Sequence, residues 1–516
     1  MNRRRERLHG GGGRAARGVW NGRSIDARAG ERRESLHNDS YTRPDKPARH
    51  KNTKPIKRRQ TMARLNVFNG LAALAGTSLA LTLAGCGGGD APSPGSAEVA
   101  SCASTGSCPA SGPAQSGPAP APLCPASLDY ATVYTGGSGG GEFVKMQFDT
   151  TALTYRLQIL ESPVPKAPGS VQPTRAGVTY TGTIARLTSL PSAEQNRCAL
   201  AIRSAVPSDG GAQAVIDPAD PPIIFVGNGV AGGGIPGATI SYPGVDLGIG
   251  APIGAIPAKT FPIYPVLAFA ETETDFAKVA GTYNMLGYHL VPSGGNLFPA
   301  GNFIPATAQT VETLNADGTC TAASGSCRST GNPWRPRAQN DGAFESNNDA
   351  GTRQYPFFYT QSLVSGPTTK AKGILVAGKL NGALVPLLIR TGYAHIDLTD
   401  LLDPINVDDE SGLAFLAPAA TLTSAQLNGS YVGSGSDFVY TSSIVQDKLV
   451  GLVDPLTTNV KGAFQLDFSQ ARPGQIGTTD NSGTTGTLIA TGHAFAHLAG
   501  TGGANPTFRV SVFASP

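Results

Sequence analysis

The sequence lacks the pattern of a helical protein. No stretch of about twelve residues shows a helical apolar stripe without a glycine or proline, and the 516 residues include 66 glycines and 40 prolines. What the sequence has instead is short apolar runs rich in β-branched and aromatic residues, among them EFVKMQFDTTALTYRLQIL, PPIIFVGNGV and TFRVSVFA. Gly, Pro, Asn and Asp lie between these runs, which is typical of strands and turns. The body of the chain is therefore predicted to be all-β.

Two motifs recur at a long and nearly constant interval. The first is a tyrosine near the start of a strand, and the second is an apolar strand that runs into a small residue and a glycine. They occur at Tyr134, Tyr283 and Tyr431, and at Val226, Val376 and Ala490. We therefore expect antiparallel barrel- or sandwich-like modules in series, over residues 127–275, 276–424 and a shorter 425–516. A single β-propeller-like body built from the same hairpins is the alternative.

Positive charge is concentrated at the start of the chain. Residues 1–61 contain 18 Lys or Arg and 6 Asp or Glu, a net charge of +12, and the remaining 22 Lys or Arg and 30 Asp or Glu give −8. The basic segment has almost no apolar periodicity, so we predict that it is disordered and that it lies upstream of the true start codon. From Cys86 onward the net charge is −9 (21 Lys or Arg, 30 Asp or Glu). This charge argues against nucleic acid as a partner.

An apolar segment begins directly after the basic block. An arginine follows Met62 closely, Leu65–Leu83 is largely apolar or small, and the segment ends at Leu83-Ala84-Gly85-Cys86. This is the three-part layout of a secretory signal peptide, which we predict over residues 62–85 with Met62 as its first residue. A membrane-spanning helix from Leu65 to Ala84 is the alternative, but polar residues dilute it and no basic stop-transfer cluster follows.

The ending LAGC resembles the lipobox of bacterial lipoproteins, in which an aliphatic residue and two small residues precede a cysteine. The resemblance implies that Cys86 is the first mature residue and carries a diacylglyceryl thioether, with an acyl chain such as palmitate on its amine. These chains would hold the protein on the lipid bilayer. In Gram-negative lipoproteins an aspartate after the cysteine favours retention at the inner membrane, and here Gly87 favours the outer membrane, on its periplasmic or surface face. The whole chain resembles uncharacterised lipoproteins of proteobacteria, some of them grouped as a domain of unknown function.

The other cysteines also fit an exported protein. Gly, Pro, Ala and Ser dominate residues 86–126, so this segment is predicted to be an extended tether. An even number of cysteines remains beyond Cys86, which suggests disulfides in an oxidising compartment: Cys102, Cys108, Cys124, Cys198, Cys320 and Cys327. Cys102 with Cys108 and Cys320 with Cys327 could close small loops, which would leave Cys124 to pair with Cys198. Because there is no C-x-x-C spacing and no histidine lies near a cysteine, we expect no metal site.

No motif predicts a catalytic residue or a cofactor. The stretch GGSGG around Ser138 matches the G-x-S-x-G pattern of a nucleophile elbow, but a strand follows it where an elbow needs a helix. GILVAGKL nearly matches a phosphate loop, but Leu380 replaces the Ser or Thr that would hold magnesium. If His493 and His497 lie on a strand, they stand about 13 Å apart and cannot share a metal ion. The acidic loop DLTDLLDPINVDDESG lacks the spacing of a calcium loop.

Five aromatic residues are candidates for ligand contact: Trp334, Tyr355, Phe357, Phe358 and Tyr359. They could form a stacking platform for sugars or proteins, although core packing explains aromatic residues on a strand equally well. We therefore predict an anchored outer-membrane protein that binds or scaffolds envelope proteins or glycans, and a binding protein more than an enzyme. The alternative is a hydrolase of envelope glycans or esters, which would need a nucleophile or two carboxylates gathered in a cleft.

Overall fold

The computed structural model describes residues 121–515 apart from 245, 247, 249, 251, 253–254, 293–302, 323–324, 329, 348–360, 363–371, 397–404, 409–410, 438 and 504. The basic segment, the signal peptide, Cys86, Cys102 and Cys108 lie outside these residues, as do Tyr355, Phe357, Phe358 and Tyr359. What the sequence predicts for them stays a prediction.

Strands dominate the described part of the chain. Its helices are α1 (Ala193–Cys198), α2 (Phe276–Val279) and the 3-10 helix η1 (Ser424–Gln426). None of the described helices is long and apolar enough to cross a membrane. Every strand pairing is antiparallel, and two of the sheets close into barrels. The predicted all-β class is therefore confirmed, as barrel modules in series and not as a propeller.

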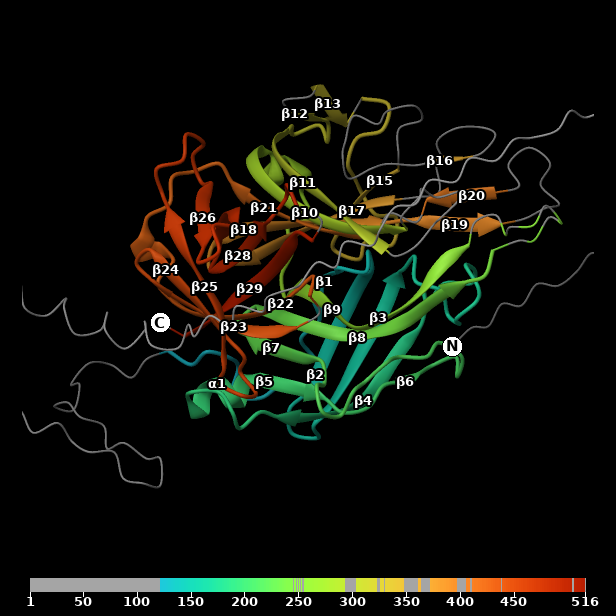
Figure 1. Ribbon diagram of the computed structural model, residues 1–516, viewed down its shortest axis with the longest axis horizontal. Helices are drawn as coiled ribbons and strands as arrows, with labels where there is room; N and C mark the ends of the chain where they lie inside the picture. The colour runs from blue at the N-terminus through green and yellow to red at the C-terminus, as the bar shows by residue number, and fades with distance from the viewer. Residues whose placement is uncertain are drawn as a thin grey trace, which may run out of the picture. The chain divides into compact units, whose positions relative to one another are not determined.

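Strands β1–β9 form the first sheet, which we call the N-terminal barrel (Figure 1). Its strands run in the order β3-β2-β1-β9-β8-β7-β5-β4, with β6 added beside β4, and a pairing of β3 with β4 closes the ring. The bounds are β1 (Tyr134–Ser138), β2 (Phe143–Asp149), β3 (Thr154–Glu161), β4 (Thr179–Arg186), β5 (Ala199–Ile202), β6 (Val206–Pro207), β7 (Ile223–Gly227), β8 (Val230–Tyr242) and β9 (Ile256–Phe269). Helix α1 leads into β5 and begins with a capping box, in which the Ser192 side chain accepts a bond from the backbone N–H of Gln195.

The middle sheet is open. Its order is β13-β12-β11-β10-β21-β18-β17-β15-β14, and β16, β20 and β19 form a separate three-stranded sheet. The bounds are β10 (Gly281–Pro292), β11 (Phe303–Leu314), β12 (Cys320–Ala322), β13 (Gly325–Arg328), β14 (Arg335–Pro336), β15 (Phe344–Asn347), β16 (Gln361–Ser362), β17 (Lys372–Leu380), β18 (Ala383–Thr391), β19 (Tyr393–Ile396), β20 (Ile405–Asp408) and β21 (Ser411–Pro418).

The last eight strands form a closed up-and-down barrel, which we call the C-terminal barrel. Each strand pairs with the next in the chain, and β22 pairs with β29 to close the ring. The bounds are β22 (Gly429–Gly435), β23 (Tyr440–Gln446), β24 (Leu449–Val453), β25 (Val460–Asp467), β26 (Ile476–Asp480), β27 (Thr485–Thr491), β28 (Ala494–Ala499) and β29 (Thr507–Ser515). Although this sheet uses the fewest residues, it is a complete barrel.

The three sheets share one arrangement of four strands. In each sheet the first strand pairs with the last, and the last strand pairs with the second strand of a hairpin. These sets are β1, β9 and β7–β8, then β10, β21 and β17–β18, then β22, β29 and β27–β28. The three recurring tyrosines lie on the three first strands, and the second recurring motif lies on the three hairpins.

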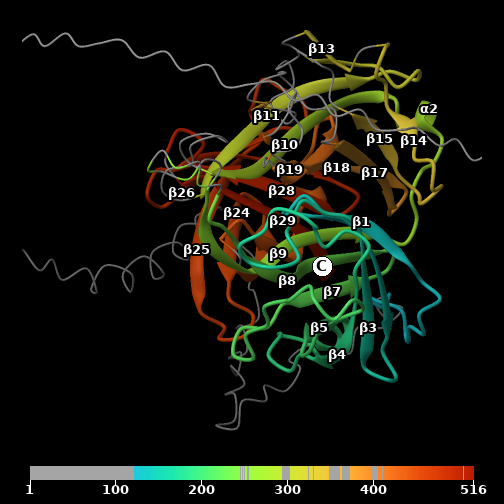
Figure 2. The same ribbon diagram turned by 90° about the vertical axis from the view of Figure 1, so that its right-hand side faces the viewer.

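Contacts between the sheets follow a cyclic order. Strand β1 packs on the hairpin β17–β18, β10 packs on β27–β28, and β22 packs on β7–β8. Head-to-tail contacts of this kind close a ring when the rotation between units permits it. A shared core lies between the sheets and includes Phe269, Leu387 and Val512, one from each sheet, and Figure 2 shows their strands β9, β18 and β29. Gly378 permits the close approach, because a Cβ there would lie 2.2 Å from a ring carbon of Phe269.

Candidate functional site

A cavity of about 660 Å³ opens at one end of the C-terminal barrel. We call this end the mouth. The lining residues that matter chemically are Asp437, Thr441, Phe464, Thr478, His497 and Arg509. Small closed barrels often hold one ligand inside, and ligand cavities usually combine apolar walls with a few placed polar groups. The mouth has both, because Leu452, Ala463 and Phe464 line it beside the polar residues.

Strand alternation explains why the barrel interior is polar only towards the mouth. On β29, Arg509, Ser511 and Phe513 point to the inside, whereas Val510 and Val512 belong to the core shared by the three sheets. Deeper in the barrel, the Phe513 ring packs edge-on against Tyr431, with ring centroids 5.5 Å apart. The far half of the interior is filled by apolar side chains. A ligand can therefore enter the barrel only part of the way.

Arg509 is the buried cation of the mouth, with 8% of its surface exposed. Its guanidinium donates to Thr441 Oγ1 and, over 3.1 Å, to Asp437 Oδ2. Burial lowers the pKa of Arg509, and the attraction of Asp437 does not fully compensate. The Asp437 side chain is 42% exposed, so water screens its charge. The charge of Arg509 is therefore only partly balanced within the barrel.

His497 is neutral at physiological pH. Its Nε2 lies 2.9 Å from Thr478 Oγ1, and its ring stacks on Phe464 with centroids 4.2 Å apart. Burial, and then the positive charge of Arg509, lowers the pKa of His497 to about 3. A general base works best when its pKa lies near the operating pH. His497 is therefore a poor base for activating the Thr478 hydroxyl as a nucleophile.

Asp480 is equally unsuited to donate a proton in the mouth. The Ser482 hydroxyl and the backbone N–H of Thr484 donate to it, and these bonds lower the pKa of its carboxyl group. General acids among carboxyl groups need a raised pKa, which burial or a like charge provides. The mouth therefore has the chemistry of a binding site more than that of a hydrolase.

A second cavity, of about 810 Å³, lies where the turns of the hairpins β7–β8, β17–β18 and β27–β28 meet. Its lining is mainly apolar and includes Leu123, Leu380 and Phe513. Its charged groups bind each other: Arg197 Nη2 lies 2.6 Å from Glu194 Oε1. This cavity therefore offers a ligand less polar chemistry than the mouth does.

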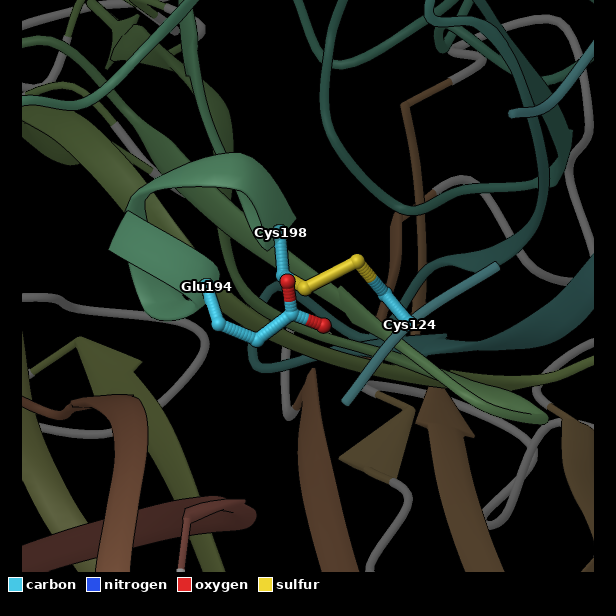
Figure 3. Close-up of side chains that lie close together, drawn as sticks. All are labelled: Cys124, Glu194 and Cys198. Carbon is cyan, nitrogen blue, oxygen red and sulfur yellow. A yellow bond between two sulfur atoms is a disulfide. The ribbon is translucent and has the colours of Figure 1, made fainter. Parts of the chain in front are cut away.

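The Cys124–Cys198 disulfide joins the segment before β1 to the end of α1 (Figure 3). The neighbouring residues Leu123 and Arg197 line the second cavity. The sulfur atoms of the disulfide are 2.04 Å apart, and the Glu194 carboxylate from α1 lies close to them. Because the two sulfurs are bonded to each other, the three residues do not provide the thiolates of a metal site. Cys320 is also disulfide-bonded, but the side chain of Cys327 lies outside the described residues.

The remaining motifs from the sequence do not gather at the mouth. Ser138 ends β1 in an antiparallel hairpin with β2, so a strand does follow the GGSGG stretch and no nucleophile elbow forms there. The stretch GILVAGKL lies in strand β17. His493 occupies a turn with φ of 64°, whereas His497 lies inside the barrel. Trp334 is 4% exposed and packs in the core of the middle sheet, so it offers no open face to a ligand.

Sequence reasoning did not find Arg509 or its partners. The signal that could have found it is the alternation of TFRVSVFA, which puts Arg509 and Ser511 on one face and Val510 and Val512 on the other. A charged residue on an inward strand face is a candidate for function, because burial of a charge is costly. The partners Asp437 and Thr441 lie some seventy residues earlier, and only the closure of the barrel brings them together.

A family model matches residues 154–512. The chain belongs to DUF2957, a family of proteins of unknown function. The match begins at the start of β3 and ends within β29, so the DUF2957 region takes in strands of all three sheets and every residue of the mouth named above. No curated protein and no solved structure matches the chain.

Proposed function

We propose that this DUF2957 protein is a lipid-anchored binding protein of the cell envelope, and that its C-terminal barrel holds a small molecule in the mouth. The observation that carries the proposal is the cavity with Arg509 at its base and an apolar wall at Phe464. Its volume lies within the range of small-molecule sites, about 300–1,000 Å³. The closed barrel fixes the lining side chains before a ligand arrives, which reduces the entropy cost of binding.

Binding is favoured over hydrolysis by the protonation states in the mouth. The lowered pKa of His497 weakens it as a base, and the lowered pKa of Asp480 weakens it as an acid. The partners predicted from the sequence, envelope proteins and glycans, are compatible with such a binding protein and remain predictions.

Two further features support export and anchoring. The lipobox-like ending at Cys86 would lead to acylation of this cysteine, and the acyl chains would anchor the protein in the envelope. Gly87 after the cysteine favours the outer membrane. The Cys124–Cys198 disulfide fits an oxidising compartment, since disulfides are rare in reducing ones.

Blocking the mouth should abolish ligand binding. Gly462 lines the cavity, and a Cβ added there meets nothing within 4 Å, so Gly462→Trp should fill the mouth without a clash at the backbone. In a thermal-shift screen of small metabolites, we expect compounds that raise the Tm of the wild-type chain by about 5 °C. The same compounds should leave the Tm of Gly462→Trp unchanged.

The matched control is Gly451→Trp. Gly451 is also open around its Cβ, but its neighbours Val450 and Leu452 point into the barrel, so Gly451 points outwards. Gly451→Trp should keep the full thermal shift. If every active compound shifts Gly462→Trp as strongly as the wild type, or if none shifts the wild type, the mouth is not a binding site.

Loss of Cys86 should release the protein from the membrane. We expect mass spectrometry of the mature protein to find an acylated N-terminal Cys86. The Cys86→Ser variant should lack the acyl chains and should no longer be found in the outer-membrane fraction. Cys108→Ser, in the same predicted tether, should leave acylation unchanged. An intact peptide that spans Lys57 to Arg64 on the exported protein would contradict both the signal peptide and the start at Met62.

A further inference from the structure

We infer that the ligand of the mouth is a small organic carboxylate, bound by the Arg509 guanidinium. The inference rests on the proposed function, because it names the chemical class that the mouth would take. Two features carry it: the unused donors of Arg509 and the distribution of charge around the cavity.

Arg509 has hydrogen-bond donors to spare. A guanidinium carries five N–H donors in a planar fork that suits a carboxylate. In the described part of the chain, its side-chain bonds go to Thr441 and Asp437. The contrast with Arg175 in the N-terminal barrel is informative, because Arg175 binds Glu142 through two nitrogens, over 2.6 and 2.7 Å. Arg175 has its carboxylate within the chain, whereas Arg509 meets a single, half-exposed Asp437 oxygen.

Two buried hydroxyls lie below Arg509 inside the barrel. Ser511 follows Arg509 by two residues on β29, and Ser443 follows Thr441 by two residues on β23, so both face the interior. They are 1% and 0% exposed, and neither hydroxyl has a partner among the described residues. Because they are buried and neither residue lines the cavity, they are closed to a ligand and mark the depth that it can reach.

The inner wall is closely packed beside Ser511. Gly433 pairs with Thr441 on one side and with Ser511 on the other, and it contributes no side chain. A Cβ at Gly433 would lie 2.7 Å from Ser511 Oγ. The same Cβ would lie 1.9 Å from the backbone oxygen of Val510, so strand β29 already fills this space and a ligand stops at the level of Arg509.

The charges around the cavity favour a monoanion. Asp437 and Asp480 both line the mouth and would repel a dianion such as a phosphate ester. The other lining cation, Lys461, lies 3.1 Å from Asp454, and its side chain is 47% exposed. The apolar wall at Phe464 and Leu452 would contact the remainder of the ligand.

Calorimetry with three probes tests the inference on the full-length protein in detergent. Benzoate is the carboxylate, benzamide its neutral counterpart, and phenyl phosphate the dianion. We expect benzoate to bind the wild type at least about tenfold more tightly than either other probe. Arg509→Gln should weaken benzoate binding about tenfold to a hundredfold, because it removes a charge-assisted bond. Ser511→Ala should leave it unchanged, because Ser511 does not line the cavity.

Ser434→Ala is a second control, beside Ser511→Ala. Ser434 is also fully buried and its hydroxyl has no partner in the described residues, but it faces the neighbouring Gly234 outside the barrel interior. Both serine variants should keep or raise the Tm of the ligand-free protein, since each removes an unsatisfied hydroxyl. Neither variant should change the affinity for benzoate.

The outcomes separate the inference from the proposed function. Equal affinity for benzoate and benzamide, full benzoate affinity in Arg509→Gln, or no benzoate binding up to millimolar concentration overturns the carboxylate inference. If Gly462→Trp still abolishes the binding of a compound found in the thermal-shift screen, the mouth is a site for ligands other than carboxylates. If Gly462→Trp and the wild type behave alike with every compound, the proposed function fails as well.

Discussion

Glu142→Ala is expected to lower the free energy of unfolding by about 3–5 kcal/mol. Glu142 and Arg175 form an ion pair inside the N-terminal barrel, with 0% and 1% of their side chains exposed. Removal of the carboxylate would leave the Arg175 guanidinium buried without a counter-charge. Chemical denaturation at neutral pH, followed by tyrosine fluorescence, measures the effect.

The surroundings of this pair explain why the loss should be large. Glu142 Oε1 also accepts from the Ser162 hydroxyl over 2.7 Å, and Glu142 Oε2 accepts from Ser138 over 3.2 Å. The Arg175 guanidinium lies 5.8 Å from the ring centroids of Tyr180 and Tyr264. Burial lowers the pKa of Arg175, but Glu142 raises it by more, so the pKa of the arginine lies above its usual range. Without Glu142, the serine hydroxyls and the guanidinium would all lose this carboxylate at once, and the guanidinium would keep its bonds to the backbone carbonyls of Pro236 and Gly237.

A surface ion pair in the same barrel provides the control. Lys166 Nζ lies 2.7 Å from Asp209 Oδ2, and both side chains are 28% exposed. Lys166→Met should cost about 1 kcal/mol or less, because water already screens this pair. The double variant Glu142→Leu with Arg175→Met should be more stable than Glu142→Ala, since it leaves no buried charge. A loss below about 1 kcal/mol in Glu142→Ala would show that the pair is not responsible for stability in this barrel.

The fold class could be predicted because its signals are local. Strand runs and turn residues alternate along the chain, and the recurring tyrosines lie on the first strand of each sheet. Tyr134, Tyr283 and Tyr431 are 1%, 4% and 1% exposed, so each is held by core packing at an equivalent place. The sequence shows Gly378 as part of the second motif. It does not show why a glycine is needed there, which is that the ring of Phe269 from another sheet packs against it.

The candidate site could not be predicted because closure of the barrel creates it. Strand β29 is buried on both faces, so the alternation of Arg509 with Val510 does not reveal which face meets a cavity. Thr441 and Asp437 reach Arg509 only because β29 returns to β22 at the end of the chain. In the same way, Trp334 looked like a contact residue because burial cannot be read from one aromatic residue in a loop-like stretch. Such pairings depend on the three-dimensional path of the chain and have no short-range signal.

The one described cysteine pair leads to the second large expected effect. Replacing Cys124 and Cys198 together by alanine should lower the free energy of unfolding by about 4 kcal/mol. The two cysteines are 74 residues apart in the sequence, and the loop-entropy relation gives about 3 kcal/mol for a 15-residue loop and 4.7 for a 100-residue loop. The disulfide also holds the segment around Cys124 against α1. Denaturation with and without reductant measures the effect.

Two comparisons identify the crosslink as the cause. Arg197 donates to the backbone carbonyls of Cys124 and Pro125, so Arg197→Met removes the neighbouring bonds and keeps the disulfide. It should cost about 1–2 kcal/mol, clearly less than loss of the crosslink. Cys320 is also disulfide-bonded, so reductant should destabilise both proteins and make the reduced wild type about as stable as the reduced double variant. The difference between the two oxidised proteins then measures the Cys124–Cys198 crosslink. A double variant as stable as the oxidised wild type would mean that packing alone holds this segment and that the disulfide adds no stability.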